Sequence, residues 1–162
     1  RAGESPTNYV HRVTMAKARA AADRLARRGL PPAPILAADT TVAIGGTILG
    51  KPADGDDARR MLALLSGRSH RVLTAIAVVR GSRIESRINV SRVCFGRMTR
   101  ADIDRYVATG EPLGKAGGYA IQGMAARFVR RIEGSHSGIM GLPLFETARL
   151  LRGDANPSPA PR

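Results

Sequence analysis

The sequence is poor in cysteine and has no apolar stretch long enough to cross a membrane. Its one cysteine, Cys94, excludes an internal disulfide and is typical of a protein kept in a reducing cytoplasm. The longest apolar runs fall well short of a bilayer span, and no basic segment followed by an apolar core opens the chain. These absences argue against a membrane protein and a secreted one, and they predict a cytoplasmic location.

Aromatic residues are also scarce, at 4% of the chain, although the net charge is +13. A charge of this size in general favours nucleic-acid binding. However, the sequence has no zinc-ligand spacing, no aromatic stacking platform and no long basic run; its tightest arginine clusters are pairs such as Arg27-Arg28 and Arg130-Arg131. We interpret the charge as a general attraction for anions, including phosphorylated small molecules, with nucleic-acid binding as the less favoured alternative.

Lysine is rare as well. Of 26 basic residues only Lys17, Lys51 and Lys115 are lysine, which leaves 26 − 3 = 23 arginines. A lysine retained in such a composition indicates a position where a compact ammonium fits and a planar guanidinium does not. Chance is the alternative for so few residues, but Lys51 and Lys115 both adjoin glycine or proline turns.

The length of 162 residues, with 43% hydrophobic residues, predicts one globular domain, over residues 1–152. The proline-rich segment 153–162 is expected to be a disordered tail. Helices and strands interleave irregularly, which favours an α/β fold with a mixed, partly antiparallel sheet flanked by helices. The expected elements are a helix over 6–28, a strand over 35–38 that ends at Asp39, a hairpin of 41–44 with 47–49, a helix over 54–66, a hairpin of 71–80 with 83–95, a helix from 99 to 109, a strand over 126–132, a loop over 134–138 and a helix over 143–151.

The segment 110–123 carries five glycines together with Lys115 and Gln122. Glycine permits positive φ and a close approach of the backbone to a ligand, and successive N–H groups in such a loop can surround an anion. A flexible surface loop is the alternative, but flexible linkers rarely place large apolar residues between glycines, as this segment does with Tyr119 and Ile121. This pattern predicts a ligand-binding loop.

Asp39 is the best candidate for a catalytic residue. It follows an apolar strand, and open α/β sheets bind their ligands at the carboxyl ends of strands. A carboxylate there can hold a divalent metal or orient an attacking water. From the residues alone, an aspartate that caps the strand end through an Asx-turn is an equally good interpretation.

Other motifs are weaker. Gly45 to Lys51 approaches a Walker-type phosphate loop, but Pro52 replaces its Ser/Thr and the intervening residues suit a hairpin. His70 and His136 have no metal-ligand spacing and are expected on polar loops or strands. Cys94 is expected to be a small core residue rather than a nucleophile.

These motifs together resemble the Maf family of nucleoside triphosphate pyrophosphatases, which have also been called septum formation inhibitors. The resemblance is nearly continuous from residue 4 to residue 151. The matching segments are Glu4-Ser5-Pro6, Tyr9-Val10, Lys17-Ala18-Arg19-Ala20, Ala38-Asp39-Thr40, Gly50-Lys51-Pro52, Leu65-Ser66-Gly67, 109–112, 115–123, 131–135 and Gly141-Leu142-Pro143-Leu144.

The resemblance implies a two-lobed α/β fold with a central cleft, related to inosine triphosphate pyrophosphatases. It implies hydrolysis of a nucleoside triphosphate to the monophosphate and pyrophosphate with a divalent cation, Mg²⁺ or Mn²⁺, in a homodimeric enzyme linked to cell-division arrest or to cleaning of the nucleotide pool. Asp39 matches the family's catalytic and metal-binding carboxylate. Lys17, Lys51 and Lys115 match substrate-binding lysines on the phosphate side. Thr40 and Gln122 match the substrate-binding positions of the branch that acts on dTTP and UTP.

The sequence departs from the family in two places. Gly114 stands where the family usually has aspartate, and the family's first strand with its Ser-Pro-Arg-Arg phosphate loop does not occur in residues 1–162. The second departure predicts that the chain as given is folded but weakly active or inactive. A catalytically impaired nucleotide-binding or division-regulating protein is therefore the alternative to an active enzyme.

Overall fold

A five-stranded antiparallel sheet forms the centre of the fold in the computed structural model, which describes residues 3–153. The strand order is β2-β1-β3-β4-β5, and every pairing between neighbours is antiparallel. The strands are β1 (Ile35–Ile44), β2 (Thr47–Leu49), β3 (Ser69–Arg80), β4 (Arg83–Phe95) and β5 (Val129–Glu133). The α/β character is confirmed, but the expected mixed sheet is wrong. Two-residue turns join β1 to β2 and β3 to β4, and such turns can link only antiparallel strands.

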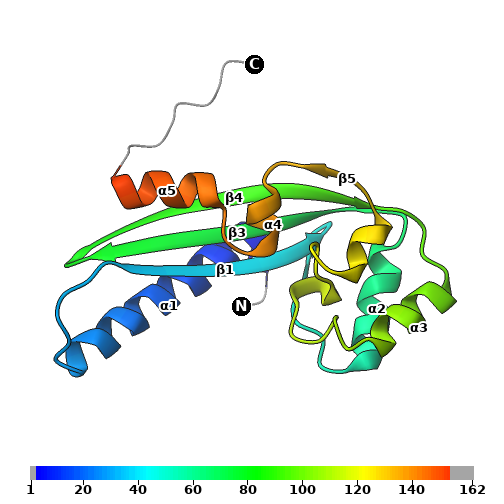
Figure 1. The fold of residues 1–162 in the computed structure, drawn as a ribbon, viewed down its shortest axis with the longest axis horizontal. Helices are drawn as coiled ribbons and strands as arrows, with labels where there is room; N and C mark the ends of the chain where they lie inside the picture. Colours follow the sequence, from blue (N-terminus) through cyan, green and yellow to red (C-terminus); the bar gives the residue numbers. More distant parts are fainter. Residues whose placement is uncertain (1–2, 154–162) are drawn as a thin grey trace, which may run out of the picture.

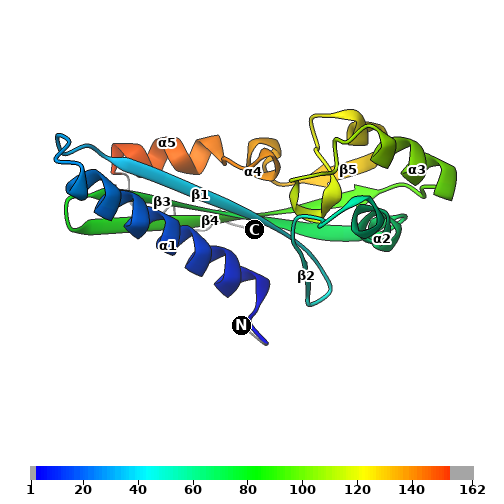
Figure 2. The same cartoon turned by 90° about the horizontal axis from the view of Figure 1, so that it is seen from below.

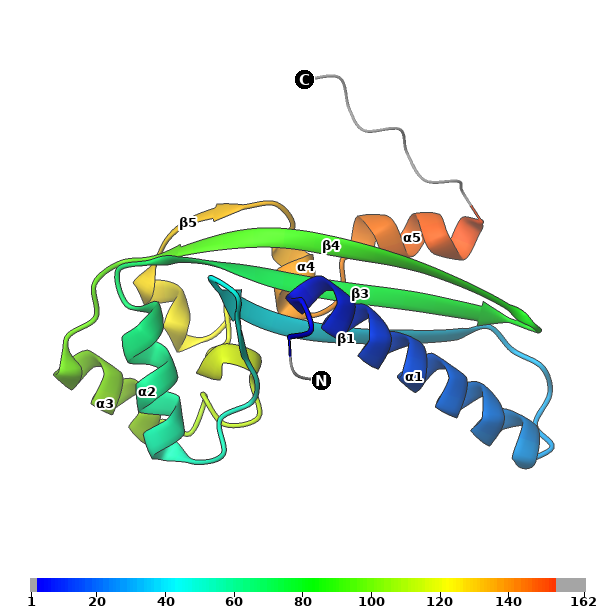
Figure 3. The same ribbon diagram turned by 180° about the vertical axis from the view of Figure 1, so that it is seen from behind.

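Helices cover both faces of the sheet and one of its ends (Figure 1). The long helix α1 (Pro6–Arg27) lies on one face against β1 and β3, as Figure 3 shows from behind. The short α4 (His136–Met140) and α5 (Leu144–Arg152) lie on the opposite face (Figure 2). The helices α2 (Gly55–Leu65) and α3 (Arg100–Ala108) gather at one end of the sheet with two 3₁₀ segments, η1 (Ala116–Gly118) and η2 (Met124–Phe128).

Side chains cap the first turns of the two helices expected over 6–28 and from 99 to 109. The Ser5 hydroxyl accepts from the Asn8 N–H at 3.2 Å before Pro6 begins α1. At α3, Thr99 and Asp102 form a reciprocal capping box, because each side chain accepts from the backbone N–H of the other. Both expected helices are confirmed, and these hydrogen bonds fix where they begin.

The main core lies between the sheet and the α2–α3 end of the molecule. It includes Leu62, Leu65, Val93 and Tyr106, all fully buried. Smaller clusters fill the space under α1, around Val10, and under α5. The central strand β3 is therefore buried on both faces, which explains its nearly continuous apolar sequence.

Three expected elements differ in the structure. The strand expected over 35–38 continues through Asp39 to Ile44, because residues 35–43 all pair with β3. The loop expected over 134–138 becomes helix α4, in which the Gly138 N–H donates to the capping Ser135 hydroxyl at 3.0 Å. The strand expected over 126–132 divides into η2 and β5. The predicted tail falls almost wholly on residues 154–162, which lie outside the described residues.

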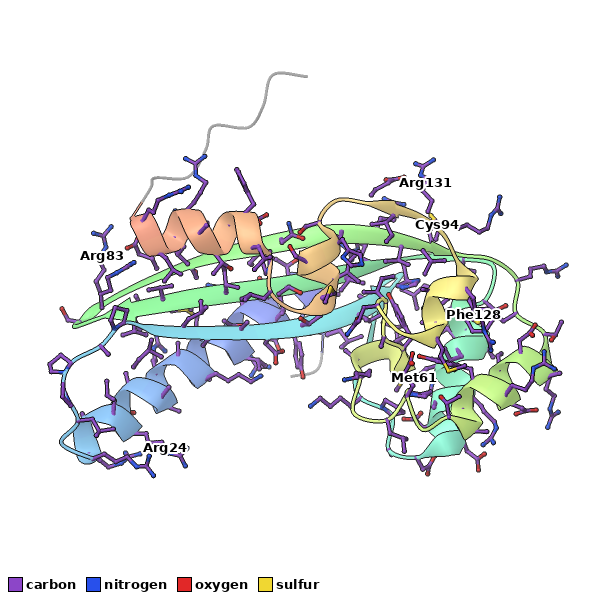
Figure 4. The ribbon with its side chains drawn as sticks, in the orientation of Figure 1. Arg24, Met61, Arg83, Cys94, Phe128 and Arg131 are labelled. Atoms are coloured by element: carbon purple, nitrogen blue, oxygen red, sulfur yellow. The ribbon has the colours of Figure 1, made fainter. Side chains whose placement is uncertain are left out.

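The arginines are spread over the surface. Figure 4 labels Arg24 on α1, Arg83 at the start of β4 and Arg131 on β5, and the three project from separate parts of the molecule. Many of these guanidinium groups pair with carboxylates nearby in the sequence, as Arg105 does with Asp102 at 2.6 Å. Within residues 3–153, no helix combines the length and the apolar character needed to span a bilayer.

Candidate active site

A cleft of about 250 Å³ lies beside β1, between the glycine-rich segment and the end of α4. Segments that are far apart in the sequence form its wall: β1, the segment after β2, β3, the glycine-rich segment with η1, and α4. Five of the six predicted site residues line it: Asp39, Thr40, Lys51, Lys115 and Gln122. The sixth, Lys17, does not line the cleft but contacts Asp39 from α1.

Asp39 lies inside β1 and not at its end, so the position expected for it is corrected. It pairs with Ala75 of β3 in the regular ladder, and its carboxylate bonds to a side chain rather than capping a turn. Lys17 Nζ donates to Asp39 Oδ1 at 2.5 Å, with the lysine about half exposed and the aspartate 19% exposed. The second oxygen, Oδ2, accepts no hydrogen bond within residues 3–153. The Asx-turn interpretation is therefore wrong.

Neighbouring side chains of a strand point to opposite faces of the sheet, and here the partners confirm it. Asp39 faces α1, where Lys17 lies, whereas Thr40 faces Thr74 and Gly138 on the side of α4. The cleft extends along β1 so that both residues contribute to its lining.

Lys51 and Lys115 are brought together by a backbone contact. The Gly117 N–H donates to the Gly50 carbonyl at 2.9 Å, which joins the segment after β2 to the glycine-rich segment. Gly117 has φ +71°, and a Cβ there would lie 2.9 Å from Val42 Cγ1, so a side chain does not fit. Both ammonium groups are exposed, and neither forms a salt bridge within residues 3–153. They are thus available to an anion in the cleft.

The glycine-rich segment is held in place by Glu111. Its carboxylate accepts from the Tyr106 hydroxyl at 2.7 Å and from the Met124 N–H at 2.9 Å, and it also accepts a longer bond from Ala125 N–H. Burial opposes ionisation of Glu111, but these bonds and the charge of Lys115 together hold its pKa below the usual value. A Cβ at Gly123 would lie 2.4 Å from Glu111 Oε1, so this contact also depends on glycine. These contacts anchor the glycine-rich segment to the fold, so it is not the flexible surface loop considered as the alternative.

Thr40 and Gln122 differ in how firmly they are held. The hydroxyls of Thr40 and Thr74 are 2.8 Å apart, and Thr74 in turn donates to the Gly138 carbonyl at 2.7 Å. Gln122 is exposed, and its amide makes no hydrogen bond within residues 3–153. The cleft thus combines one fixed hydroxyl with one amide that can adapt to a ligand.

Comparison with known proteins places the chain in a family. A family model described as Maf-like protein matches residues 1–153. The chain is 63% identical over 150 residues to the dTTP/UTP pyrophosphatase of Cupriavidus pinatubonensis, covering 93% of this chain and 75% of that protein. It is 62% identical to the protein of the same name from Burkholderia pseudomallei, covering 93% of this chain and 73% of that protein. For the one from Polaromonas sp. the identity is 60%, over 92% and 74% of the two chains.

The chain belongs to the Maf family.

Sequence reasoning missed three residues that shape this Maf cleft. Thr74 and Glu111 support the lining residues from outside, and only the folded contacts reveal them. His70 was expected on a polar loop or strand, but on β3 its side chain is buried, with Nε2 2.7 Å from the Tyr119 hydroxyl and the ring against Phe95. Burial lowers the pKa of His70 to about 4, so the ring is neutral at pH 7.

No group of three or more His, Cys, Asp or Glu side chains converges within residues 3–153. Among the described residues that line the cleft, Asp39 is the only one with an acidic side chain. A single carboxylate suits Mg²⁺ or Mn²⁺ when substrate phosphates and waters supply the other ligands.

Proposed function

We propose that this Maf protein hydrolyses dTTP and UTP to the nucleoside monophosphate and pyrophosphate. The observation that carries the proposal is the single cleft in which Asp39, Thr40, Lys51, Lys115 and Gln122 meet. The names of the relatives, dTTP/UTP pyrophosphatase at 60–63% identity, point to the same substrates.

The phosphate chain lies at the lysines in this proposal. Lys51 and Lys115 bind phosphate oxygens as point charges, and Lys17 adds a third positive charge beside Asp39. Together they counter the charge that the departing pyrophosphate carries, as phosphoryl transfer requires.

Asp39 is the group that acts on the attacking water. Lys17 occupies Oδ1, and Oδ2 accepts a proton from a water aligned with the α-phosphorus. The water oxygen forms a new bond to the α-phosphorus, and the bond from that phosphorus to the α,β-bridging oxygen breaks. The monophosphate retains the water oxygen, and pyrophosphate leaves with the bridging oxygen.

A divalent cation completes the proposed site. Asp39 would hold Mg²⁺ or Mn²⁺ through its carboxylate, together with phosphate oxygens of the substrate. When bound, the cation supplies further neutralisation of the phosphate charge. The lysines and the carboxylate of this chain orient the phosphates around it.

The base lies toward Thr40 and Gln122. A glutamine amide offers both a donor and an acceptor, which can match the edge of a pyrimidine. We further infer two lobes on either side of the cleft, a kinship with inosine triphosphate pyrophosphatases, a homodimer, and a cytoplasmic enzyme for which nucleic acid is not a partner.

The test is release of pyrophosphate from dTTP, UTP, CTP, ATP and GTP at equal concentrations with Mg²⁺ present. The expected result is one pyrophosphate per monophosphate, fastest with dTTP and UTP. Turnover of ATP and GTP as fast as that of dTTP and UTP would overturn the assignment, and so would release of orthophosphate. Nucleotide binding without any turnover would instead favour the impaired nucleotide-binding protein.

A further inference from the structure

A chain of hydroxyl groups runs from the cleft into the protein interior. It begins at Thr40 on β1, passes to Thr74, which faces Thr40 directly on β3, and ends at the Gly138 carbonyl in α4. Thr74 is 1% exposed, so no bulk water reaches its hydroxyl.

The Gly138 carbonyl at the end of this series decides which hydroxyl donates and which accepts. A carbonyl oxygen can only accept, so the 2.7 Å contact between Thr74 and Gly138 requires the single hydroxyl proton of Thr74. Thr74 then has no proton for Thr40, and the 2.8 Å contact between the two hydroxyls requires the proton of Thr40. Thr40 therefore presents only lone pairs to the cleft.

We propose that Thr74 is a positioning residue that selects the base by fixing Thr40 as a hydrogen-bond acceptor. This inference rests on the proposed function. The ring edge of uracil and thymine carries an N3–H donor between two carbonyl oxygens, whereas N3 of cytosine is an acceptor. An acceptor at Thr40 pairs with the N3–H of UTP or dTTP and meets the cytosine N3 with a second acceptor. Thr74 thus excludes CTP without touching it.

The structure suggests a substitution that removes the hydroxyl with little other damage. Valine has nearly the shape of threonine, and the Gly138 carbonyl still accepts from the Gly141 N–H at 3.1 Å when Thr74 is changed. In Thr74→Val, the Thr40 hydroxyl is released and can turn its proton toward the cleft. It then donates to the cytosine N3 or accepts from the uracil N3–H.

The experiment measures kcat/KM for UTP and CTP in the wild type, Thr74→Val and Thr74→Ser. For Thr74→Val, kcat/KM for CTP is expected to rise at least about tenfold while that for UTP stays within about threefold, because one mismatched hydrogen bond is relieved. Thr74→Ser keeps the hydroxyl and is expected to keep the wild-type ratio. Thr147→Val is the matched control: it removes another buried hydroxyl, in α5, whose partner is the Pro143 carbonyl.

Structural damage alone would lower both rates together, so an equal fall with UTP and CTP overturns the inference. A second test places Thr74→Val in a Thr40→Val background. There the ratio of UTP to CTP is expected not to change further, and a shift as large as in the single variant would contradict an action through Thr40.

Binding separates this inference from the proposed function. Calorimetric affinities for UTP and CTP are compared for Asp39→Asn with and without Thr74→Val. If the wild type hydrolyses UTP but neither rate nor affinity ratio changes with Thr74→Val, the inference falls and the function stands. If no nucleotide is hydrolysed but the affinity ratio shifts toward CTP, the function falls and the inference stands.

Discussion

His70 is expected to make the stability of the chain depend on pH, and replacing it with glutamine tests this directly. The ring lies in the core between Phe95 and Tyr119, where it is 2% exposed. Its Nδ1 has no hydrogen-bond partner within the described part of the chain. Protonating this ring would bury a charge among aromatic groups, and for that reason its pKa falls from 6.5 to about 4.

The size of the effect follows from the two pKa values. Above pH 6.5 the ring is neutral in both the folded and the unfolded chain, and His70 does not favour unfolding. As the pH falls below 6.5 the unfolded chain takes up the proton first, so the free energy of unfolding decreases until about pH 4. Each unit of pKa corresponds to about 1.4 kcal/mol, which gives a loss of about 2 kcal/mol between pH 7 and pH 5.

Urea unfolding of the wild type and His70→Gln at pH 5, 6 and 7 measures this loss. Carboxylates contribute to the pH dependence of both proteins, so the informative quantity is the difference between them, which should change by about 2 kcal/mol from pH 7 to pH 5. The exposed His136 provides the control, since His136→Gln should follow the wild type. A difference between wild type and His70→Gln that stays constant with pH would refute the reasoning.

Two further substitutions test the cleft. Asp39→Asn is expected to reduce turnover of UTP at least about 100-fold with little change in melting temperature, because the amide cannot take the proton of the attacking water. Near-normal rates would remove Asp39 from the reaction. Gly117→Ala should lower the free energy of unfolding by about 1–3 kcal/mol more than Gly114→Ala, since both glycines have positive φ but only the first lies against Val42. Equal losses in urea titrations would show that the Val42 contact is unimportant.

Features set by neighbouring residues could be predicted from the sequence. The capping box of Thr99 and Asp102 needs partners three residues apart, and the turn at Gly81-Ser82 needs only a change of backbone direction. The rarity of lysine among so many arginines also indicates Lys51 and Lys115 as candidates for an anion site, and both line the cleft.

Features that depend on distant partners could not be predicted. The polar residues after Ala38 resemble the end of a strand, but pairing with β3 carries β1 onward to Ile44. Gly138 is a poor helix former in isolation; its place in α4 depends on the Ser135 cap and on a close approach to Asn89, 49 residues earlier (138 − 89 = 49). Thr74 and Glu111 act only through side chains that the sequence does not place beside them.

The alternation along β1 has a consequence for how this protein can change. Asp39, which we assign to the reaction, and Thr40, which we assign to the base, are adjacent but face opposite sides of one strand. Inserting one residue into β1 ahead of them would turn each to the other face, so that the carboxylate would take the place opposite Thr74 and the hydroxyl would point to the face that α1 covers. An insertion in the turn at Gly81-Ser82, far from both, would leave this pairing intact. The proposed roles in the reaction and in substrate choice therefore depend on the same register of β1. A new substrate preference can arise in this strand through substitutions, but not through insertions.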